Sequence, residues 1–390
     1  MNPKENHSDG MNPIREAPVT SERKSERNYG ADLLKIVSMW MIPVLHVLGH
    51  GGILELAQPF TFRGGAAWLL EAAAFCAVNN YALISGYVGY GKRFRPSRLI
   101  YLYLQVLFYR LLITALFLLF RPEAVTAEQV LNALIPVRFG HWYFTAYFSL
   151  FFFIPFLNRV IQSFEKKACE WLMLALFFVL SLLPTLLQAD TGYSSYGYSA
   201  LWLGALYLGG AYLKKYDIPS RVTGKTALLL YVSGTGVTWL TGLAVGHVNY
   251  LRLGYPLGQN LLLQYISPTV LLCAVGLLLF FARLKVAGRW VTFIRFFAPL
   301  SFAVYLIHTE PLIWNNLFYR AFAGLIALPS YLLIPAVLGT AFTIWLGCSL
   351  IDRLRLALFD LCHVGELSER LERMIEAVLK KCLPSLWAAE

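Results

Sequence analysis

Long apolar blocks separated by short polar segments dominate the chain. Each block is about 20 residues long, which is the length of helix that crosses a bilayer. About ten blocks fit this length, at 31–52, 66–90, 99–120, 141–161, 170–188, 198–214, 226–246, 260–282, 297–319 and 329–350. The pattern therefore predicts an all-α, polytopic integral membrane protein.

Composition and charge support this fold class and add an orientation. Only 14% of the residues are charged and 58% are hydrophobic, whereas a soluble domain carries roughly 25% charged residues. Of the 33 Lys and Arg residues, 27 fall in alternate polar segments that include both termini, or at the ends of the apolar blocks next to them, and five fall in the others. The positive-inside rule then predicts an even number of spans with both termini in the cytoplasm. The net charge of +11 favours anionic membrane lipids as partners, not nucleic acid.

The chain is predicted to have three parts. Residues 1–28 are polar and are expected to form a disordered cytoplasmic N-terminus. The ten-helix membrane domain is placed at 29–352, and residues 353–390 form a cytoplasmic tail. In that tail, apolar residues at spacings of four and three predict an amphipathic helix, at Leu367, Leu371, Met374, Val378 and Cys382. This helix would lie on the inner leaflet or the bundle, or it would form a homodimer.

The most informative polar residue inside an apolar block is His46. It lies eleven positions after Lys35, so both residues share one face of a helix, about 16 Å apart. An ionisable group inside a membrane helix is costly and indicates chemistry, transport or a buried pairing. A neutral imidazole there can accept a proton as a general base. Asp32 lies three residues before Lys35 and can pair with it, although an interfacial anchor would use the same two residues.

Two arginines mark the start of the third predicted span. Arg95 and Arg98 lie in RFRPSRL, where Pro96 suits the first turn of a helix. A helix N-terminus attracts anions, and guanidinium groups add directional donors. The segment predicts a phosphate site, and the alternative is an ordinary positive-inside cluster.

Other polar and aromatic residues inside the spans suggest supporting roles. Arg110 lies midway through the third span, where an unpaired charge is expensive, and Glu71 is its predicted partner. His308 lies in the ninth span and has either a structural or a catalytic role. Trp142 and Tyr143 either line an acceptor groove or belong to the interfacial aromatic belt. No cysteine spacing indicates a disulfide framework or a metal site.

The order of these residues resembles membrane acyltransferase family 3. The resemblance covers about residues 27–350, and its segments are Lys35-x10-His46 with Asp32 ahead of it, NNYALISGYVGY (79–90), Arg95-x-x-Arg98, HWYFTAYFSLFFFIPFLN (141–158) and SFAVYLIHTEPL (301–312). Lys35 stands where many members have arginine, which alone offers a bidentate fork. The resemblance implies a multi-pass enzyme of the bacterial cytoplasmic membrane that acylates glycans, usually with acetyl-CoA.

The same resemblance implies roles for the candidate residues. His46 would act as general base, with Lys35 and Asp32 near the cytoplasmic mouth, and Arg95 and Arg98 would hold the phosphates of acetyl-CoA. Substrate contacts or support would come from Arg110, Glu71, His308, Trp142 and Tyr143. The acceptor would be a glycan or lipid-linked sugar, acylated either directly or through a histidyl-acyl intermediate. A separate extracytoplasmic partner could receive the acyl group instead.

Two other classes of protein compete with an enzyme. A transporter of a small polar solute, such as an amino acid, would also place His and Arg inside the membrane. Transport predicts internal repeats and broken helices near the midplane, and the sequence contains no evident repeat. A membrane scaffold would explain the amphipathic tail but not His46.

Overall fold

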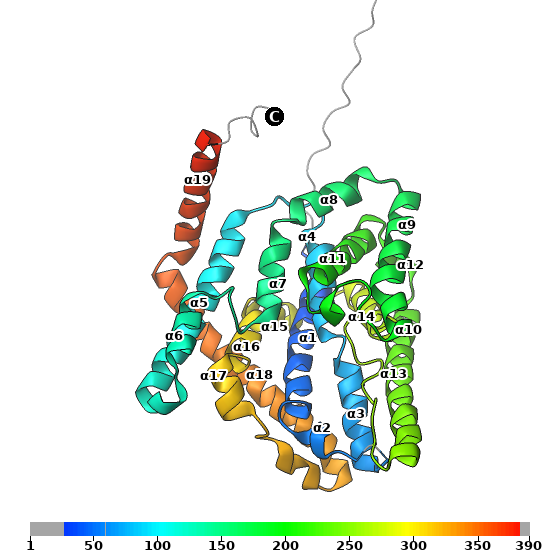
Figure 1. The fold of residues 1–390 in the computed structure, drawn as a ribbon. Helices are drawn as coiled ribbons and strands as arrows, with labels where there is room; N and C mark the ends of the chain where they lie inside the picture. Colours follow the sequence, from blue (N-terminus) through cyan, green and yellow to red (C-terminus); the bar gives the residue numbers. More distant parts are fainter. Residues whose placement is uncertain (1–26, 59, 383–390) are drawn as a thin grey trace, which may run out of the picture.

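The computed structural model describes residues 27–58 and 60–382, and this part of the chain contains helices, turns and no strand (Figure 1). Seven helical segments in it are long and apolar enough to cross a membrane. They are α1 (Tyr29–Leu48), α3 with α4 (Phe62–Ala74, Ala77–Gly89), α5 (Pro96–Phe120), α9 to α10 (Lys166–Phe177, Leu183–Leu187), α13 (Gly224–Leu253), α15 to α16 (Arg289–Phe297, Ser301–His308) and α18 (Ser330–Leu361). The all-α, multi-pass class is thereby confirmed.

An eighth span is formed if a bent pair of helices is counted. Helix α7 (Trp142–Phe151) and helix α8 (Ile154–Ser163) meet at 58°. Pro155 lies in the first turn of α8, where proline is tolerated but cannot continue a preceding helix. Helices α11 (Ala200–Lys215) and α14 (Pro268–Ala282) correspond to two more predicted blocks but are shorter than a full span. The count of ten spans and the side of the membrane on which the termini lie stay predictions.

Short segments connect these helices. The short α-helices are α2 (Ile53–Leu56), α6 (Ala127–Leu134), α12 (Ile218–Arg221) and α17 (Pro311–Ile313). The 3-10 and π segments are η1 (Pro122–Ala124), η2 (Phe178–Leu182), η3 (Ser195–Gly197), η4 (Ala298–Leu300), η5 (Trp314–Phe318) and η6 (Ala323–Ala327). Helix α19 (Val364–Cys382) ends the described chain.

Two predicted spans are only partly helical, and both breaks lie beside the candidate active site around His46. The block 260–282 becomes helical at Pro268, and the block 297–319 breaks after His308. Irregular backbone inside a membrane protein needs internal partners. Asn79 donates to the Tyr265 carbonyl at 2.8 Å, and Ser181 donates to the Ile266 carbonyl at 2.5 Å. These bonds stabilise the unwound segment that carries Tyr265 into the bundle.

Helix α1 occupies the centre of the bundle. It begins after Asn28, whose side chain accepts a hydrogen bond from the Ala31 amide at 2.9 Å and so caps the helix. It packs against α3, α4, α14, α16 and α18. About two-thirds of its apolar window is buried, against 17% for α9 to α10 at the periphery. Its polar side chains therefore face protein, not lipid.

Helices α4 and α11 make the closest helix contact near the site. A Cβ at Gly86 would lie 1.9 Å from the Tyr207 carbonyl oxygen, and one at Gly210 would lie 2.0 Å from the Leu83 carbonyl oxygen. Small residues let membrane helices approach in this way. The close approach brings Tyr207 against α4.

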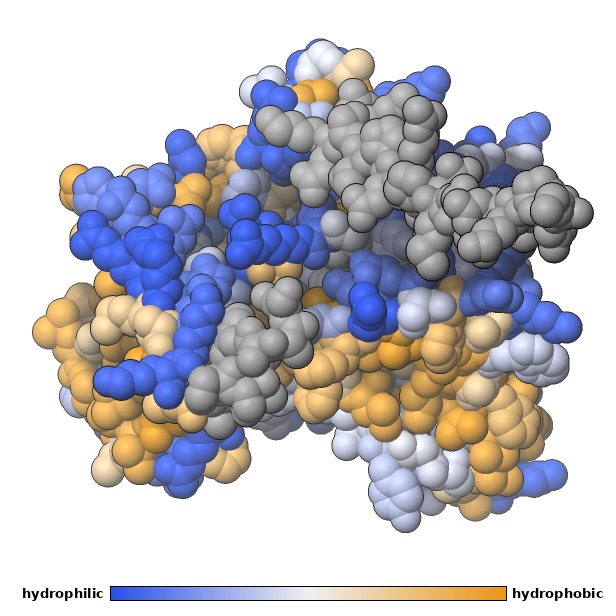
Figure 2. Space-filling model, turned by 90° about the horizontal axis from the view of Figure 1, so that it is seen from above, coloured by the Kyte–Doolittle hydropathy of each residue, from blue (hydrophilic) through white to orange (hydrophobic). Residues whose placement is uncertain are grey.

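Basic and acidic side chains gather at one end of the bundle, which we call the basic end. It carries the start of α1, the loop 90–95, the end of α11 and helix α19 (Figure 1). Viewed from this end, hydrophilic residues spread across the face and apolar residues lie beside them (Figure 2). The amphipathic helix predicted in the tail is found as α19, which packs on α5. Residues 1–26 and 383–390, within the predicted disordered N-terminus and the tail, lie outside the described residues.

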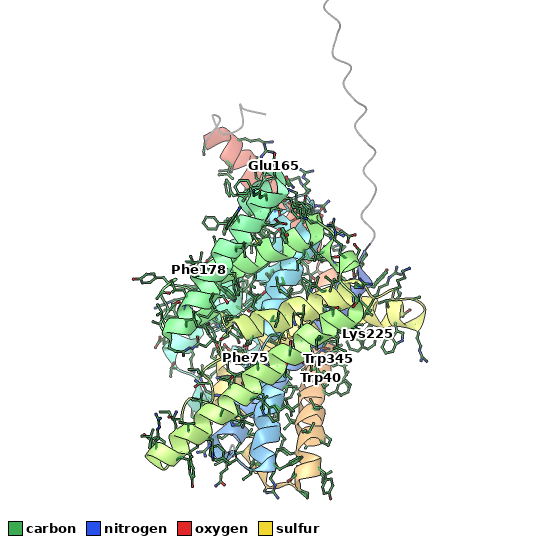
Figure 3. The ribbon with its side chains drawn as sticks, turned by 90° about the vertical axis from the view of Figure 1, so that its right-hand side faces the viewer. Trp40, Phe75, Glu165, Phe178, Lys225 and Trp345 are labelled. Atoms are coloured by element: carbon green, nitrogen blue, oxygen red, sulfur yellow. The ribbon has the colours of Figure 1, made fainter. Side chains whose placement is uncertain are left out.

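The predicted end of the membrane domain at residue 352 is not a break in the structure. Helix α18 continues past residue 352 to Leu361. Asp352 and Arg355 are both buried within this helix and form an ion pair with each other. On the far side of the molecule, α13 crosses the bundle obliquely beside α14 (Figure 3). Helix α13 packs on α3, and α14 packs on α4.

Candidate active site

A basic pocket opens at the basic end of the bundle. Its volume is about 420 Å³. The predicted residues Asp32, Lys35, Arg95 and Arg98 all line it, although they come from α1 and from the start of α5. The pocket is completed by residues from the loop before α5, from α7, α8 and α11, among them Lys92, Arg93, Tyr147, Asn158 and Tyr207. The structure thus brings together the residues that the sequence assigned to the cytoplasmic mouth.

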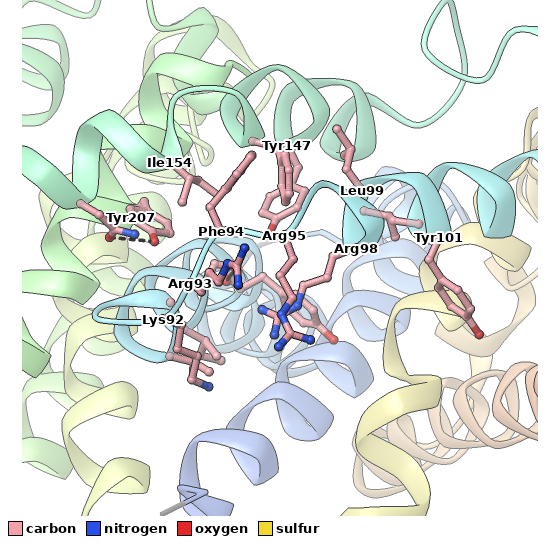
Figure 4. A pocket seen from close by; sticks show the side chains of 18 of the residues that line it. Lys92, Arg93, Phe94, Arg95, Arg98, Leu99, Tyr101, Tyr147, Ile154 and Tyr207 are labelled. Carbon is pink, nitrogen blue, oxygen red and sulfur yellow. Dashed lines mark hydrogen bonds between the residues drawn. The ribbon is translucent and has the colours of Figure 1, made fainter. Parts of the chain in front are cut away.

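Positive charge exceeds negative charge in this pocket. The guanidinium groups of Arg93, Arg95 and Arg98 gather in one region of it (Figure 4). Partial desolvation lowers the pKa of Lys92 below its ordinary value, and the nearby positive charge of Arg98 lowers it further. Helix α5 begins at Pro96, so Arg98 lies in the first turn, where the helix dipole favours anions. The pocket is suited to a ligand with several negative charges.

The predicted pairing of Asp32 with Lys35 is not found. The Asp32 Oδ2 atom accepts from Arg27 Nε at 2.5 Å instead. Among the described residues, Lys35 forms no ion pair and lines the pocket with its side chain. Arg27, which lies just before α1 and is about half exposed, takes the place of Lys35 as the partner of Asp32. Lys35 is left available to a ligand.

A small cavity, which we call the passage, lies between the basic pocket and the interior of the bundle. Tyr81 lines both spaces and donates to the Lys35 carbonyl at 3.1 Å. The passage holds only about 30 Å³. Its walls include Tyr143, Phe302 and His46. The side chain of Tyr143 is buried, and its phenol oxygen has no hydrogen-bond partner among the described residues.

An outer cavity of about 530 Å³ lies at the other end of the passage. His46, Trp142, Tyr265 and Tyr305 line both the passage and the cavity. Glu71 and several residues that follow the break after His308 also line the cavity, namely Thr309, Pro311, Trp314 and Asn315. Tyr81 is therefore common to the basic pocket and the passage, and His46 is common to the passage and the outer cavity.

His46 and His308 form a hydrogen-bonded pair. His46 Nδ1 lies 2.8 Å from His308 Nε2, and His308 Nδ1 donates to the Val304 carbonyl one helical turn earlier. Because a neutral imidazole has one donor and one acceptor, His308 Nε2 must accept and His46 Nδ1 must donate. The second nitrogen of His46, Nε2, is left as an acceptor. The network thus assigns the tautomer that a general base requires.

The indole of Trp314, in η5, packs against His46 and His50. Its ring meets His46 edge-on, with centroids 4.7 Å apart, and stacks on His50 at 3.9 Å. His50 Nε2 also donates to the Trp314 carbonyl at 3.0 Å.

The predicted pairing of Arg110 with Glu71 is wrong. Arg110 Nη1 donates to the Phe139 carbonyl at 2.6 Å, and the carboxylate that attracts it is Glu310. Arg110 is on α5, which packs on α16 and α17, whereas Glu71 is on α3 and lines the outer cavity. The break after His308, which carries Glu310 toward α5, could not be predicted from the pattern of apolar residues.

Aromatic residues surround the passage, and the sequence identified only some of them. Trp142 and Tyr143 were predicted, and both line the passage. Tyr265, Tyr305 and Trp314 were not. Tyr305 and Trp314 lie in or near the segment that resembled the family, which is the one signal that could have found them. Tyr265 gave no signal, because it is in a stretch that was expected to be a continuous helix.

No three His, Cys, Asp or Glu side chains within residues 27–58 and 60–382 are grouped as metal ligands would be. The polar groups that could hold a ligand are instead the cations of the basic pocket and the polar lining of the outer cavity. The arrangement can bind an anionic molecule in the basic pocket, and it places the imidazole of His46 at the wall of the passage and of the outer cavity.

One of three comparisons with known proteins gave a match. A family model described as an acyltransferase domain matches residues 28–351. No curated protein and no solved structure gave a match. The matched region begins just before α1 and ends in α18, so it contains all three spaces and both histidines.

Proposed function

The chain belongs to acyltransferase family 3, and from this premise we propose that it transfers an acyl group, acetyl in the simplest case, from acyl-CoA to a hydroxyl of an acceptor. The acceptor in this proposal is a cell-envelope glycan or a lipid-linked sugar. The observation that carries the proposal is the position of His46, between a basic pocket and an outer cavity. The protein would lie in a bacterial cytoplasmic membrane with its basic end in the cytoplasm.

The basic pocket suits the nucleotide end of acyl-CoA. The phosphates carry several negative charges, and the side chains of Lys35, Arg95 and Arg98 face the same space. Arginine binds phosphate oxygens with parallel, charge-assisted hydrogen bonds. Lys35 and His46 are about 16 Å apart along α1. The flexible arm of coenzyme A would cross this distance and bring the thioester through the passage.

His46 would then act on the acceptor. Its Nε2 atom accepts the proton of the acceptor hydroxyl while the hydroxyl oxygen attacks the thioester carbonyl. The carbon–sulfur bond breaks, and the coenzyme A thiolate takes the proton from the imidazolium. The buried phenol of Tyr143, which has no partner among the described residues, would donate to the oxyanion that forms during attack.

Transport is the second candidate and has one observation in its favour. The helices are broken at Pro268 and after His308, and broken helices near a central site are a feature of transporters. Family membership and a phosphate-suited pocket next to His46 favour transfer. A transporter has no need of a general base in a defined tautomer.

The proposal is tested with purified protein in detergent and labelled acetyl-CoA, by comparing His46→Ala and Arg98→Ala with the wild type. Loss of the base lowers kcat by about 10²–10⁴ without loss of acetyl-CoA binding. Loss of Arg98 weakens acetyl-CoA binding by about tenfold or more, since a hydrogen bond to a charged group contributes about 1.5–3 kcal/mol. The controls are His247→Ala and Arg289→Ala, which change exposed residues outside the pockets. Wild-type binding and turnover in both test variants would refute the proposal.

A further inference from the structure

We propose that the outer cavity binds an uncharged, hydroxyl-rich acceptor, and that Glu71 selects it by accepting a hydrogen bond from an acceptor hydroxyl. This inference rests on the proposed function and extends it, because it names the acceptor class and a specificity residue. The cavity is the space of about 530 Å³ that His46 shares with the passage. Glu71 lines it from α3.

Glu71 is a buried carboxyl group without a partner. Its side chain is 8% exposed. The Oε2 atom is shielded and forms no hydrogen bond, and the residue forms no ion pair within the described chain. A buried polar group that lacks its hydrogen bond costs about 1–3 kcal/mol, and a charged one costs more. Such a cost is typical of a group that is held ready for a ligand.

The outer cavity lacks the positive charge of the basic pocket. Among the residues that line the cavity, Glu71 is the one carboxyl group, and no Lys or Arg is present. Five cationic side chains and the single acid Asp32 line the basic pocket. An anionic acceptor would find no counter-charge in the outer cavity. A neutral acceptor with hydroxyl donors is complementary to this lining.

Aromatic rings provide the other surfaces of the cavity. Trp142 stacks on Tyr265 with centroids 5.7 Å apart and planes 25° apart. Tyr198 lies 4.9 Å from Tyr265, and Trp314 faces the cavity from the other side. Flat aromatic faces beside a few polar groups match a ring that has apolar C–H faces and hydroxyl edges. A neutral sugar has this form.

Saturation-transfer NMR on the purified full-length protein tests the inference by direct binding. The probes are methyl glucoside, methyl galactoside and methyl rhamnoside, with glucuronic acid and glucosamine as charged counterparts. We expect a neutral sugar to bind more tightly than either charged sugar. We also expect Glu71→Gln to weaken that binding by about fivefold or more, while Glu55→Gln, an exposed change at a surface ion pair, has no effect.

Two further readouts separate recognition from structure. Glu71→Gln should leave the KM for acetyl-CoA unchanged and should not lower the melting temperature, because it removes an unpartnered buried acid. A lower melting temperature with unchanged sugar binding would overturn the inference. So would tighter binding of a charged sugar, or binding of none of the neutral sugars.

Failure of this inference can be distinguished from failure of the proposed function. If the wild type binds a neutral sugar through Glu71 but releases no coenzyme A, the acyl transfer is wrong and the sugar site stands. If coenzyme A release depends on His46 but sugar binding does not depend on Glu71, the transfer stands and the assignment of Glu71 is wrong.

Discussion

At the scale of single residues, the histidine pair is the feature on which the chemistry depends. His308 accepts from His46 only because its own Nδ1 proton is used by the Val304 carbonyl. That carbonyl is one turn earlier on α16, so a regular helix fixes the direction of the whole chain of hydrogen bonds. In the proposed mechanism His308 is a positioning residue, since it would act on the acceptor only through His46.

Replacement of His308 should therefore affect kcat more than KM. His308→Leu removes the acceptor for His46 Nδ1, and we expect kcat to fall by about 10- to 100-fold, part of what general base catalysis contributes. His308→Gln keeps both a donor and an acceptor and should recover part of the loss. Steady-state kinetics with acetyl-CoA check this. Equal losses in both variants, or a change in KM alone, would argue against the positioning role.

Residues that depend on spacing along one helix were predictable from the sequence. Lys35 and His46 share a face of α1, and Arg95 and Arg98 lie at the start of α5, as the periodicity and Pro96 indicated. Contacts between helices were not predictable in this way. Arg110 was assigned to Glu71 because both were charged and buried, and only the fold shows that Glu310 is its neighbour.

At the scale of elements, a buried polar network joins α18 to α5. Arg355 makes two hydrogen bonds of 2.8 Å to Asp352, and Tyr109 donates to Asp352 at 2.6 Å. Arg355 also donates to Tyr101 at 2.9 Å. The network holds α5 in position, and the first turn of α5 carries Arg98. It was not predicted, because the pattern of apolar residues ended the domain at residue 352.

Loss of this network should destabilise the protein and weaken donor binding. Asp352 is fully buried, and removal of one partner from a buried pair costs about 3–5 kcal/mol. We expect Asp352→Asn to lower the melting temperature and to weaken acetyl-CoA binding, both measured in detergent. Asp360→Asn, an exposed change later on α18, is the control. An unchanged melting temperature would contradict the structural role given to Asp352.

The fold class was predictable because apolar length alone identifies a membrane helix. The breaks in two of the helices were harder to predict from the sequence. Proline at position 268 marks where α14 begins, yet the unwound stretch before it is as apolar as a helix and is stabilised by Asn79 and Ser181 from distant elements. Hydrogen bonds between backbone groups and side chains from distant elements cannot be read from a local sequence pattern.

At the scale of the whole molecule, the two ends of the bundle differ in charge. The basic pocket and α19 are at one end, and the outer cavity is toward the other. If the positive-inside rule holds here, the donor enters from the cytoplasm and the acceptor is reached from the opposite side.

Two exposed cysteines allow the direction to be measured. Cys362 and Cys382 are exposed and lie after α18, whereas the other four cysteines are buried. A membrane-impermeant maleimide should label these two in inside-out vesicles and not in sealed right-side-out cells. The double variant Cys362→Ser, Cys382→Ser should remain unlabelled in both. Labelling in right-side-out cells would place the basic end outside and reverse the proposed orientation.

The most direct test of the account is acyl transfer in sealed proteoliposomes of defined orientation. Labelled acetyl-CoA is supplied only on the side where Cys362 is accessible, and a neutral sugar acceptor only on the opposite side. The account predicts labelled acceptor with the wild type, a loss of about 10²–10⁴ with His46→Ala, and none when donor and acceptor are exchanged. Equal transfer after exchange, or transfer that persists in His46→Ala, would contradict it.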